Sequence, residues 1–125
     1  MKLRIKGESL RLRITPSEMA RLMESGRIDE TIHLGAGDDD RLTYAIEISV
    51  VAAETTVRHL PREIAVIVPE TASRTWAGGS DVGIYAAVAL GSRVLEVAVE
   101  KDYACLDKGL DNRDTFPNPR EGRKC

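Results

Sequence analysis

The chain has 125 residues, of which 42% are hydrophobic and 30% charged, and 18 Lys and Arg against 20 Asp and Glu give a formal net charge of −2. These proportions are those of a globular protein and exclude disordered and collagen-like chains. The longest stretch without a charged residue, 82–92, is about half as long as a membrane-spanning helix. We therefore expect one soluble domain over residues 1–125, folded without a metal or disulfide and without a membrane partner.

The start of the chain and its cysteines indicate a cytoplasmic protein. Charged and apolar residues alternate over 2–6, where a secretory signal has an uninterrupted apolar block. Cys105 and Cys125 lack CxxC spacing, and two cysteines in a chain of this length are no disulfide framework. We expect both thiols to be reduced.

The first predicted elements are a hairpin and a helix. Apolar and charged residues alternate over 3–6 and again over 9–14, and Gly7-Glu8 lies between the two runs. This period of two predicts two half-buried strands joined by a turn. Thr15-Pro16-Ser17-Glu18 has the N-cap, the early proline and the capping-box glutamate that are typical of a helix start. The helix is expected to end at Ser25-Gly26.

A second hairpin is predicted after this helix. Alternating apolar residues over 28–34 and 42–48 flank a polar loop at 35–40, which is typical of two paired strands. Residues 50–57 are predicted as strand or loop. Leu60-Pro61 marks a break before the second part of the chain.

The second part follows a similar order. A strand is predicted over 64–68, a short helix from Pro69 through Trp76, a stop at 78–81, and two further strands over 82–90 and 94–99. Trp76 at the end of a short helix indicates a core residue.

The two parts share their order of elements when superimposed with an offset of 53 or 54 residues. We therefore predict an α+β, mostly β fold: a barrel-like sheet made from two pseudo-repeated β-α-β-β halves, 1–48 and 62–99, followed by an irregular tail over 100–125. A plain α+β domain without internal symmetry is the alternative. The tail is acidic and contains proline, and Tyr103, Leu106 and Phe116 are expected to anchor it to the domain as far as Pro119.

Residues 3–48 resemble the antitoxin branch of the AbrB-like family. The resemblance rests on the Gly7-x-Ser9 strand, which ends in Arg13-Ile14 just before a helix that starts at a proline. It implies an interleaved swapped-hairpin barrel that binds DNA through basic strand residues.

A second resemblance covers nearly the whole chain. Three blocks in order, the IKGxSLRLR, EKDYxCL and DxFPNP segments, are similar to a family of short uncharacterised bacterial proteins. This resemblance implies relatives but no activity.

The strongest candidate for a binding surface is the first predicted hairpin. Five cations are expected to share its polar face: Lys2, Arg4, Lys6, Arg11 and Arg13. Such a cluster is typical of a site for phosphate or an acidic partner. The alternative is that these charges protect a sheet edge, or pair with Glu47, Glu54 and the tail carboxylates. The net charge of −2 and the scattered aromatic residues argue against nucleic acid.

The second candidate is Cys105 in the tail. Its acidic neighbours, Asp102 and Asp107, disfavour a thiolate, and neither His33 nor His59 has the spacing of a metal motif. A small buried side chain is the usual role of such a cysteine. A thiol or metal site at Cys105 stays open as an alternative.

Taken together, these patterns predict a non-enzymatic binding or interaction module that uses the basic hairpin and the acidic, Pro-containing tail. The candidate binding residues are Lys2, Arg4, Lys6, Arg11, Arg13, Asp102, Tyr103, Cys105 and Phe116. No catalytic residue, cofactor or metal is predicted. We expect the partner to be another protein or a second copy of the chain, with AbrB-like DNA binding or an antitoxin-like role as the alternative.

Overall fold

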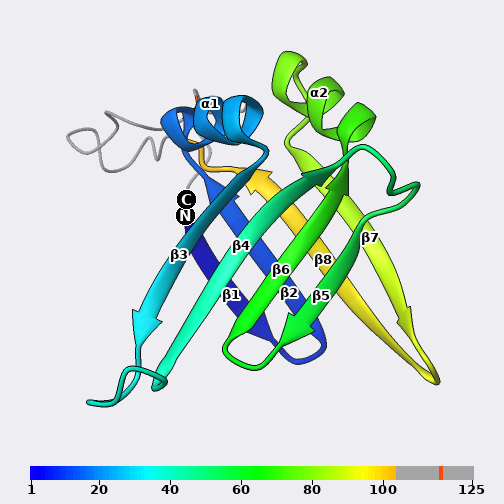
Figure 1. The fold of residues 1–125 in the computed structure, drawn as a ribbon. Coiled ribbons are helices and arrows are strands. Elements are labelled where there is room, and N and C mark those ends of the chain that lie inside the picture. Colours follow the sequence, from blue (N-terminus) through cyan, green and yellow to red (C-terminus); the bar gives the residue numbers. More distant parts are fainter. Residues whose placement is uncertain (104–115, 117–125) are drawn as a thin grey trace.

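The computed structural model describes residues 1–103 and residue 116 (Figure 1). The elements of this part, in chain order, are β1 (Lys2–Lys6), β2 (Ser9–Ile14), α1 (Pro16–Ser25), β3 (Arg27–His33), β4 (Arg41–Ser49), β5 (Thr56–Leu60), β6 (Glu63–Pro69), α2 (Glu70–Gly78), β7 (Gly83–Leu90) and β8 (Arg93–Lys101). The mostly β prediction with two helices is confirmed. Neither helix is long and apolar enough to cross a membrane.

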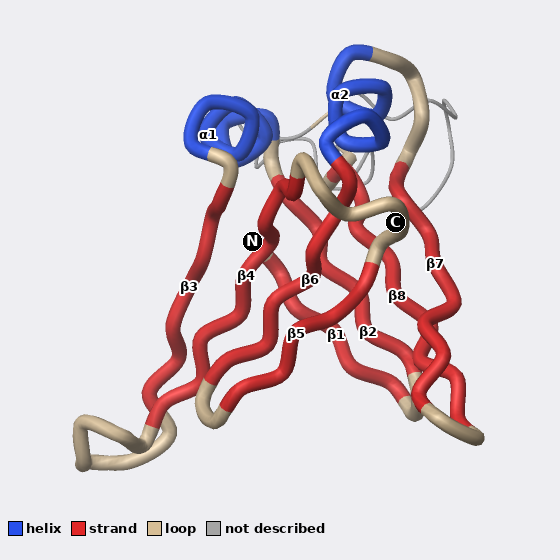
Figure 2. The backbone as a smooth tube through the Cα atoms, turned by 45° about the vertical axis from the view of Figure 1, so that its right-hand side comes forward, coloured by secondary structure: helices blue, strands red, loops and turns tan. Residues whose placement is uncertain are grey.

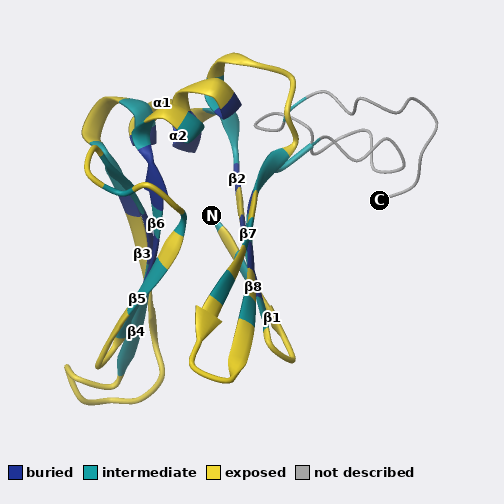
Figure 3. Cartoon of the chain, turned by 90° about the vertical axis from the view of Figure 1, so that its right-hand side faces the viewer, coloured by how far each residue is buried: buried dark blue, intermediate teal, exposed yellow. Residues whose placement is uncertain are grey.

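The strands form two separate four-stranded sheets. Sheet A has the order β1-β2-β8-β7 and sheet B the order β3-β4-β6-β5. In each sheet the two outer pairs are antiparallel and the central pair is parallel. The sheets face each other beneath the two helices and diverge away from them (Figures 2 and 3). The described strands close no barrel, so the predicted barrel-like closure is not confirmed.

One strand overlaps the stretch 50–57, predicted as strand or loop, only at residues 56–57. β5 (Thr56–Leu60) pairs with β6 across the turn at Pro61-Arg62, so a strand precedes the second predicted half, which was expected to begin at 62. In this hairpin Val57 lies opposite Val66, and in the β1–β2 hairpin Leu3 lies opposite Leu12. The order strand, strand, helix, strand, strand therefore occurs twice along the chain.

The predicted start of the first helix is confirmed in detail. The backbone N–H of Glu18 donates to the hydroxyl of Thr15 at 3.3 Å, and the backbone N–H of Thr15 donates to the Glu18 carboxylate at 2.9 Å. Gly26 ends the helix with φ 79°, and its N–H donates to the carbonyl of Leu22. This left-handed conformation suits glycine, which has no Cβ to clash.

The core lies between the two sheets, at the end covered by the helices. It contains apolar residues from both sheets and both helices: Leu10, Leu12, Ile14, Met19, Leu22, Ile28, Ile46, Val66, Val68, Trp76, Val97 and Val99. Trp76 is the largest of its fully buried side chains, and its indole N–H donates to the carbonyl of Val82 at 3.1 Å. The interpretation of Trp76 as a core residue is confirmed. Where the sheets diverge, apolar side chains such as Ile5 and Leu90 are about half exposed.

Candidate binding surface

The register of the first hairpin places the five predicted cations on one face. Lys2 lies opposite Arg13, and Arg4 lies opposite Arg11. Directly opposed residues of an antiparallel pair point to the same side of a sheet. The residues that alternate with them on β2, such as Leu12, are buried in the core, so the cations point away from sheet B. We call this side the outer face of sheet A.

The other half of the outer face of sheet A is formed by β8 and β7, and Glu100 lies beside Arg13 at the end of this face nearest α1. The carboxylate of Glu100 lies 3.5 Å from Nε of Arg11 and 3.2 Å from Nε of Arg13. The phenol of Tyr85 donates a hydrogen bond to the same carboxylate at 2.7 Å. Burial, the hydrogen bond and the negative charge of Glu100 together raise the pKa of Tyr85 to about 12, so the phenol stays protonated at neutral pH.

An open depression lies on this face between β2, β8 and β7. Its volume is about 500 Å³, and its residues are Ser9, Leu10, Arg11, Tyr85, Ala86, Ala87, Glu96, Val97, Ala98 and Glu100. Small alanine side chains line its floor, while Arg11 and the two glutamates give it polar walls.

Part of the basic charge on this face is unpaired within the described residues. Lys2 contacts Asp102 at 3.1 Å, but its side chain is 74% exposed, and such surface pairs contribute little to stability. Arg4 and Lys6 are exposed and form no ion pair in the described part of the chain. These two cations are therefore available to an acidic partner.

The sequence also allowed the hairpin cations to pair with carboxylates of the same chain. The structure shows such pairs for some of those carboxylates but not for others. Glu100 and Asp102 do pair with the hairpin. Glu47 instead contacts two arginines of sheet B, Arg27 and Arg58. The reason is the fold: β4, which carries Glu47, lies in the other sheet.

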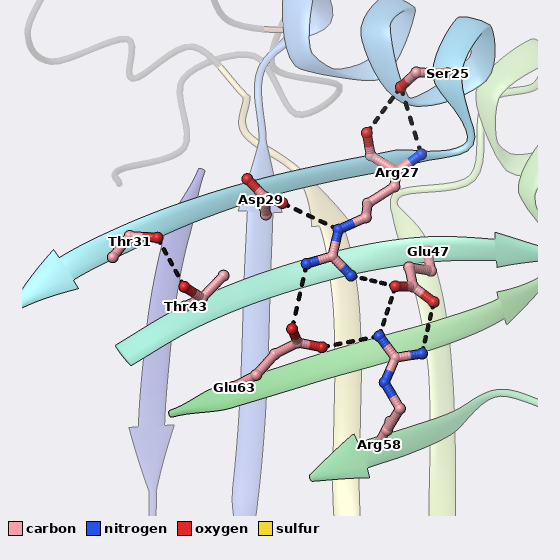
Figure 4. Close-up of polar contacts among 8 residues, drawn as sticks. All are labelled: Ser25, Arg27, Asp29, Thr31, Thr43, Glu47, Arg58 and Glu63. Atoms are coloured by element: carbon pink, nitrogen blue, oxygen red, sulfur yellow. Dashed lines mark hydrogen bonds and ion pairs between the residues drawn. The ribbon is translucent and has the colours of Figure 1, made fainter. Parts of the chain in front are cut away.

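On sheet B, the outer face carries a closed ion-pair network (Figure 4). Arg58 forms two hydrogen bonds to the Glu47 carboxylate, at 2.9 and 2.6 Å, and one to Glu63 at 2.8 Å. Arg27 contacts Glu47, Glu63 at 3.5 Å and Asp29 at 3.0 Å. The hydrogen bonds from Arg58, followed by those from Arg27, lower the pKa of Glu47 to about 2 against the opposing effect of burial.

Sequence reasoning missed this network because its members lie on four strands. The sequence shows that Arg27 and Asp29, two residues apart on one strand, are neighbours. It does not show that β4 pairs with β6. Two alanines beneath the network, Ala45 and Ala65, are fully buried. Their methyl side chains are small, so the ion pairs can lie close to the sheet.

The described tail residues lie just beyond β8. The backbone N–H of Phe116 donates to the carbonyl of Asp102 at 2.9 Å, and the Phe116 ring meets the Tyr103 ring edge to face, with centroids 5.8 Å apart. The ammonium of Lys101 lies 5.5 Å from the Phe116 centroid. Three of the candidate binding residues, Asp102, Tyr103 and Phe116, therefore lie next to one another. Cys105 lies outside the described residues, as does the rest of the expected tail packing.

The remaining polar candidates form no site in the described residues. His33 and His59 lie on β3 and β5, the two opposite edges of sheet B. No three His, Cys, Asp or Glu side chains of the described part are arranged to hold a metal ion. The acidic loop at 38–40 is exposed, and the Asp40 carboxylate accepts a hydrogen bond from the N–H of Gly37 at 3.0 Å, as in a solvated turn.

Comparison with known proteins places the chain in a family. Residues 1–120 match the model of the family of unknown function DUF7009, and the chain belongs to this family. The predicted membership in an uncharacterised family is confirmed at this level. No curated protein and no solved structure matches the chain.

Proposed function

We propose that the protein is a non-enzymatic binding module that holds an acidic segment of another protein on the outer face of sheet A. The observation that carries this proposal is the difference in charge between the two outer faces. The outer face of sheet A has five cations on β1 and β2 and two glutamates, Glu96 and Glu100, on β8. On sheet B, Arg27 and Arg58 are already compensated by three carboxylates.

The matching registers of the two halves support this proposal. We infer that the halves are pseudo-repeats, because the parallel pairs at the centres of the two sheets match. Ile14 pairs with Lys101 in sheet A, and Val68 pairs with Ile48 in sheet B. Ile14 thus corresponds to Val68 at an offset of 54 residues, and Ile48 to Lys101 at an offset of 53. At the same offsets Glu100 corresponds to Glu47. Arg11 and Arg13, however, correspond to two uncharged residues of β6, Ala65 and Ile67. Since β6 forms an equivalent strand without them, the fold does not require these cations, and a binding role explains their presence.

The described tail residues lie at the margin of the same face. Asp102 contacts Lys2 at 3.1 Å, and the Tyr103–Phe116 pair lies directly beyond it. This ion pair between a carboxylate and a hairpin cation is the kind of contact that an acidic partner would make. We therefore include Asp102, Tyr103 and Phe116 in the proposed surface as a border that limits where the partner segment binds.

Reversing the two unpaired cations tests the proposal. In the double variant Arg4→Glu, Lys6→Glu, we expect the affinity for a fluorescent deca-glutamate peptide to fall at least about tenfold, since each lost charge contact weakens encounter and binding. Fluorescence anisotropy at low salt measures the effect. The matched control is Arg21→Glu, Arg74→Glu, which changes the net charge equally on the exposed surfaces of the two helices. Equal loss in both double variants contradicts the proposal.

The same assay separates this function from AbrB-like DNA binding. A DNA duplex that binds with a steep salt dependence, while the acidic peptide does not bind, overturns the proposed function in favour of nucleic acid. The net charge of −2 and the lack of aromatic side chains among the cations of β1 and β2 are the reasons to expect the opposite result.

A further inference from the structure

The four edge strands of the two sheets differ in how they are protected against pairing with another chain. β1 carries Lys2, Arg4 and Lys6, and β3 carries both acidic and basic side chains. β5 has five residues, contains Arg58 and is followed by Pro61. Charge, short length and proline are the usual means of protecting an edge. β7 (Gly83–Leu90) has none of them: its eight residues include no charged residue and no proline.

The register of β7 shows which of its backbone groups are unused. The backbone N–H of Lys101 donates to the carbonyl of Val82 at 2.9 Å, and the pairing of Val82 with Lys101 continues the register of the β7–β8 ladder. Hydrogen-bonded pairs alternate along an antiparallel ladder. The N–H and C=O groups of Tyr85, Ala87 and Ala89 therefore point away from β8, towards the open edge.

This edge is open over most of its length in the described part of the chain. β5 of the other sheet comes near β7 only towards the helices, and the two strands then diverge (Figure 2). Ala87, Ala89 and Leu90 are exposed. An uncharged edge of this kind readily accepts another strand.

We propose that two copies of this chain associate through β7, antiparallel and edge to edge, about a two-fold axis at Ala87. Sheet A of each copy then becomes half of one eight-stranded sheet. The proposal is independent of the acidic partner proposed above. A two-fold contact uses the same patch of both copies, so the patch must be complementary to itself.

The sequence of β7 meets that requirement. With the axis at Ala87, Tyr85 lies opposite Ala89 of the second copy. The free backbone N–H and C=O groups of Tyr85, Ala87 and Ala89 then form hydrogen bonds with the same groups of the second copy. Leu90, which is 49% exposed, lies opposite Ile84 of the second copy. No like charges meet. β1 paired with itself would instead bring cations against cations, which is why we assign the contact to β7 and to a second copy.

Such an association would place two basic faces in one continuous sheet. Because the outer faces of a two-fold pair joined edge to edge lie on the same side of the sheet, a partner with two acidic segments could contact both. The hairpin cations lie on β1 and β2, which are separated from β7 by β8. Pairing through β7 therefore leaves these cations uncovered.

The mass of the full chain in solution tests the proposal. We expect sedimentation equilibrium between about 5 and 500 μM to show a particle of twice the chain mass of 13.7 kDa that accumulates with concentration. Ala87→Lys places two cations at the axis and should weaken association at least about tenfold. Thr56→Lys on β5, the edge of the other sheet, is the matched control and should associate as the unmodified chain does.

A complementary pair of variants keeps the test independent of folding effects. Ala87→Glu alone should also weaken association, and an equimolar mixture of Ala87→Lys and Ala87→Glu should restore it, because opposite charges then meet at the axis. Ala87→Pro removes an outward N–H without removing a hydrogen bond to β8 and should stay a single chain. A chain that stays single throughout the concentration range, equal loss in Thr56→Lys, or a mixture that fails to associate overturns the proposal.

Discussion

Trp76→Ala is expected to lower the free energy of unfolding by about 3–5 kcal/mol, the usual cost of truncating a buried aromatic side chain. Trp76 is only 1% exposed and lies where α2 meets both sheets. Its removal leaves a cavity beneath the helices and takes away one of the two hydrogen bonds to the Val82 carbonyl, which keeps the one from the backbone N–H of Lys101. Urea unfolding followed by circular dichroism measures the change. Such a loss is a large fraction of the roughly 5–15 kcal/mol by which an ordinary domain is stable, so the urea midpoint should fall clearly.

Trp76→Phe separates packing from hydrogen bonding at the same position. The phenyl ring retains part of the buried area but cannot donate to Val82, so we expect a loss of about 1–3 kcal/mol. If Trp76→Ala costs less than about 1 kcal/mol, as an exposed substitution does, the helices do not cover the core in the way described.

Local patterns explain why the first part of the fold could be predicted well. Alternation over 3–6 and 9–14 and the Thr15–Glu18 capping box act between near neighbours in sequence, so they are visible in one chain. The same alternation correctly predicted that Arg11 and Arg13 share a face with the cations of β1. The side of a strand that a residue occupies follows from its position in the strand alone.

Long-range pairing explains what could not be predicted. The centre of sheet A joins residues 9–14 to residues 96–101, and nothing local selects that partner. The alternation of apolar residues predicts that the last strand ends at Val99 and that Glu100 belongs to the tail, whereas β8 continues to Lys101. Glu100 is thus a strand residue beside Arg13, at the end of the basic face nearest the helices. Its contact with Arg13 at 3.2 Å depends on the parallel pairing of β2 with β8.

The outer faces of the two sheets differ in how their positive charges are balanced. Both sheets place a glutamate at the equivalent position of the central strand, Glu47 in one and Glu100 in the other. In sheet B two arginines close around the glutamate and two further carboxylates complete the network. In sheet A the cations outnumber the carboxylates, so the same framework leaves positive charge exposed. Stability is therefore expected to depend on the sheet B charges and binding on those of sheet A.

Glu47→Gln is expected to lower the free energy of unfolding at pH 7 by about 1–2 kcal/mol, because it removes the carboxylate that two half-buried arginines share, while Glu63 and Asp29 remain in contact with them. Urea unfolding measures the loss. Glu54→Gln, at an exposed position without an ion pair in the described part of the chain, is the control and should change stability by less than about 0.5 kcal/mol. Equal effects in the two variants would show that the network contributes nothing.

The pH dependence of the same variant provides a second readout. Arg58, followed by Arg27, lowers the pKa of Glu47 from 4.5 to about 2 in the folded chain. A carboxylate whose folded pKa lies below its unfolded value stabilises fully above the unfolded value, and this contribution disappears as pH falls through the folded value. The difference in stability between the unmodified chain and Glu47→Gln should therefore be largest above pH 4.5 and shrink towards pH 2. A difference that stays constant over this range would mean that the loss comes from packing and not from the carboxylate charge.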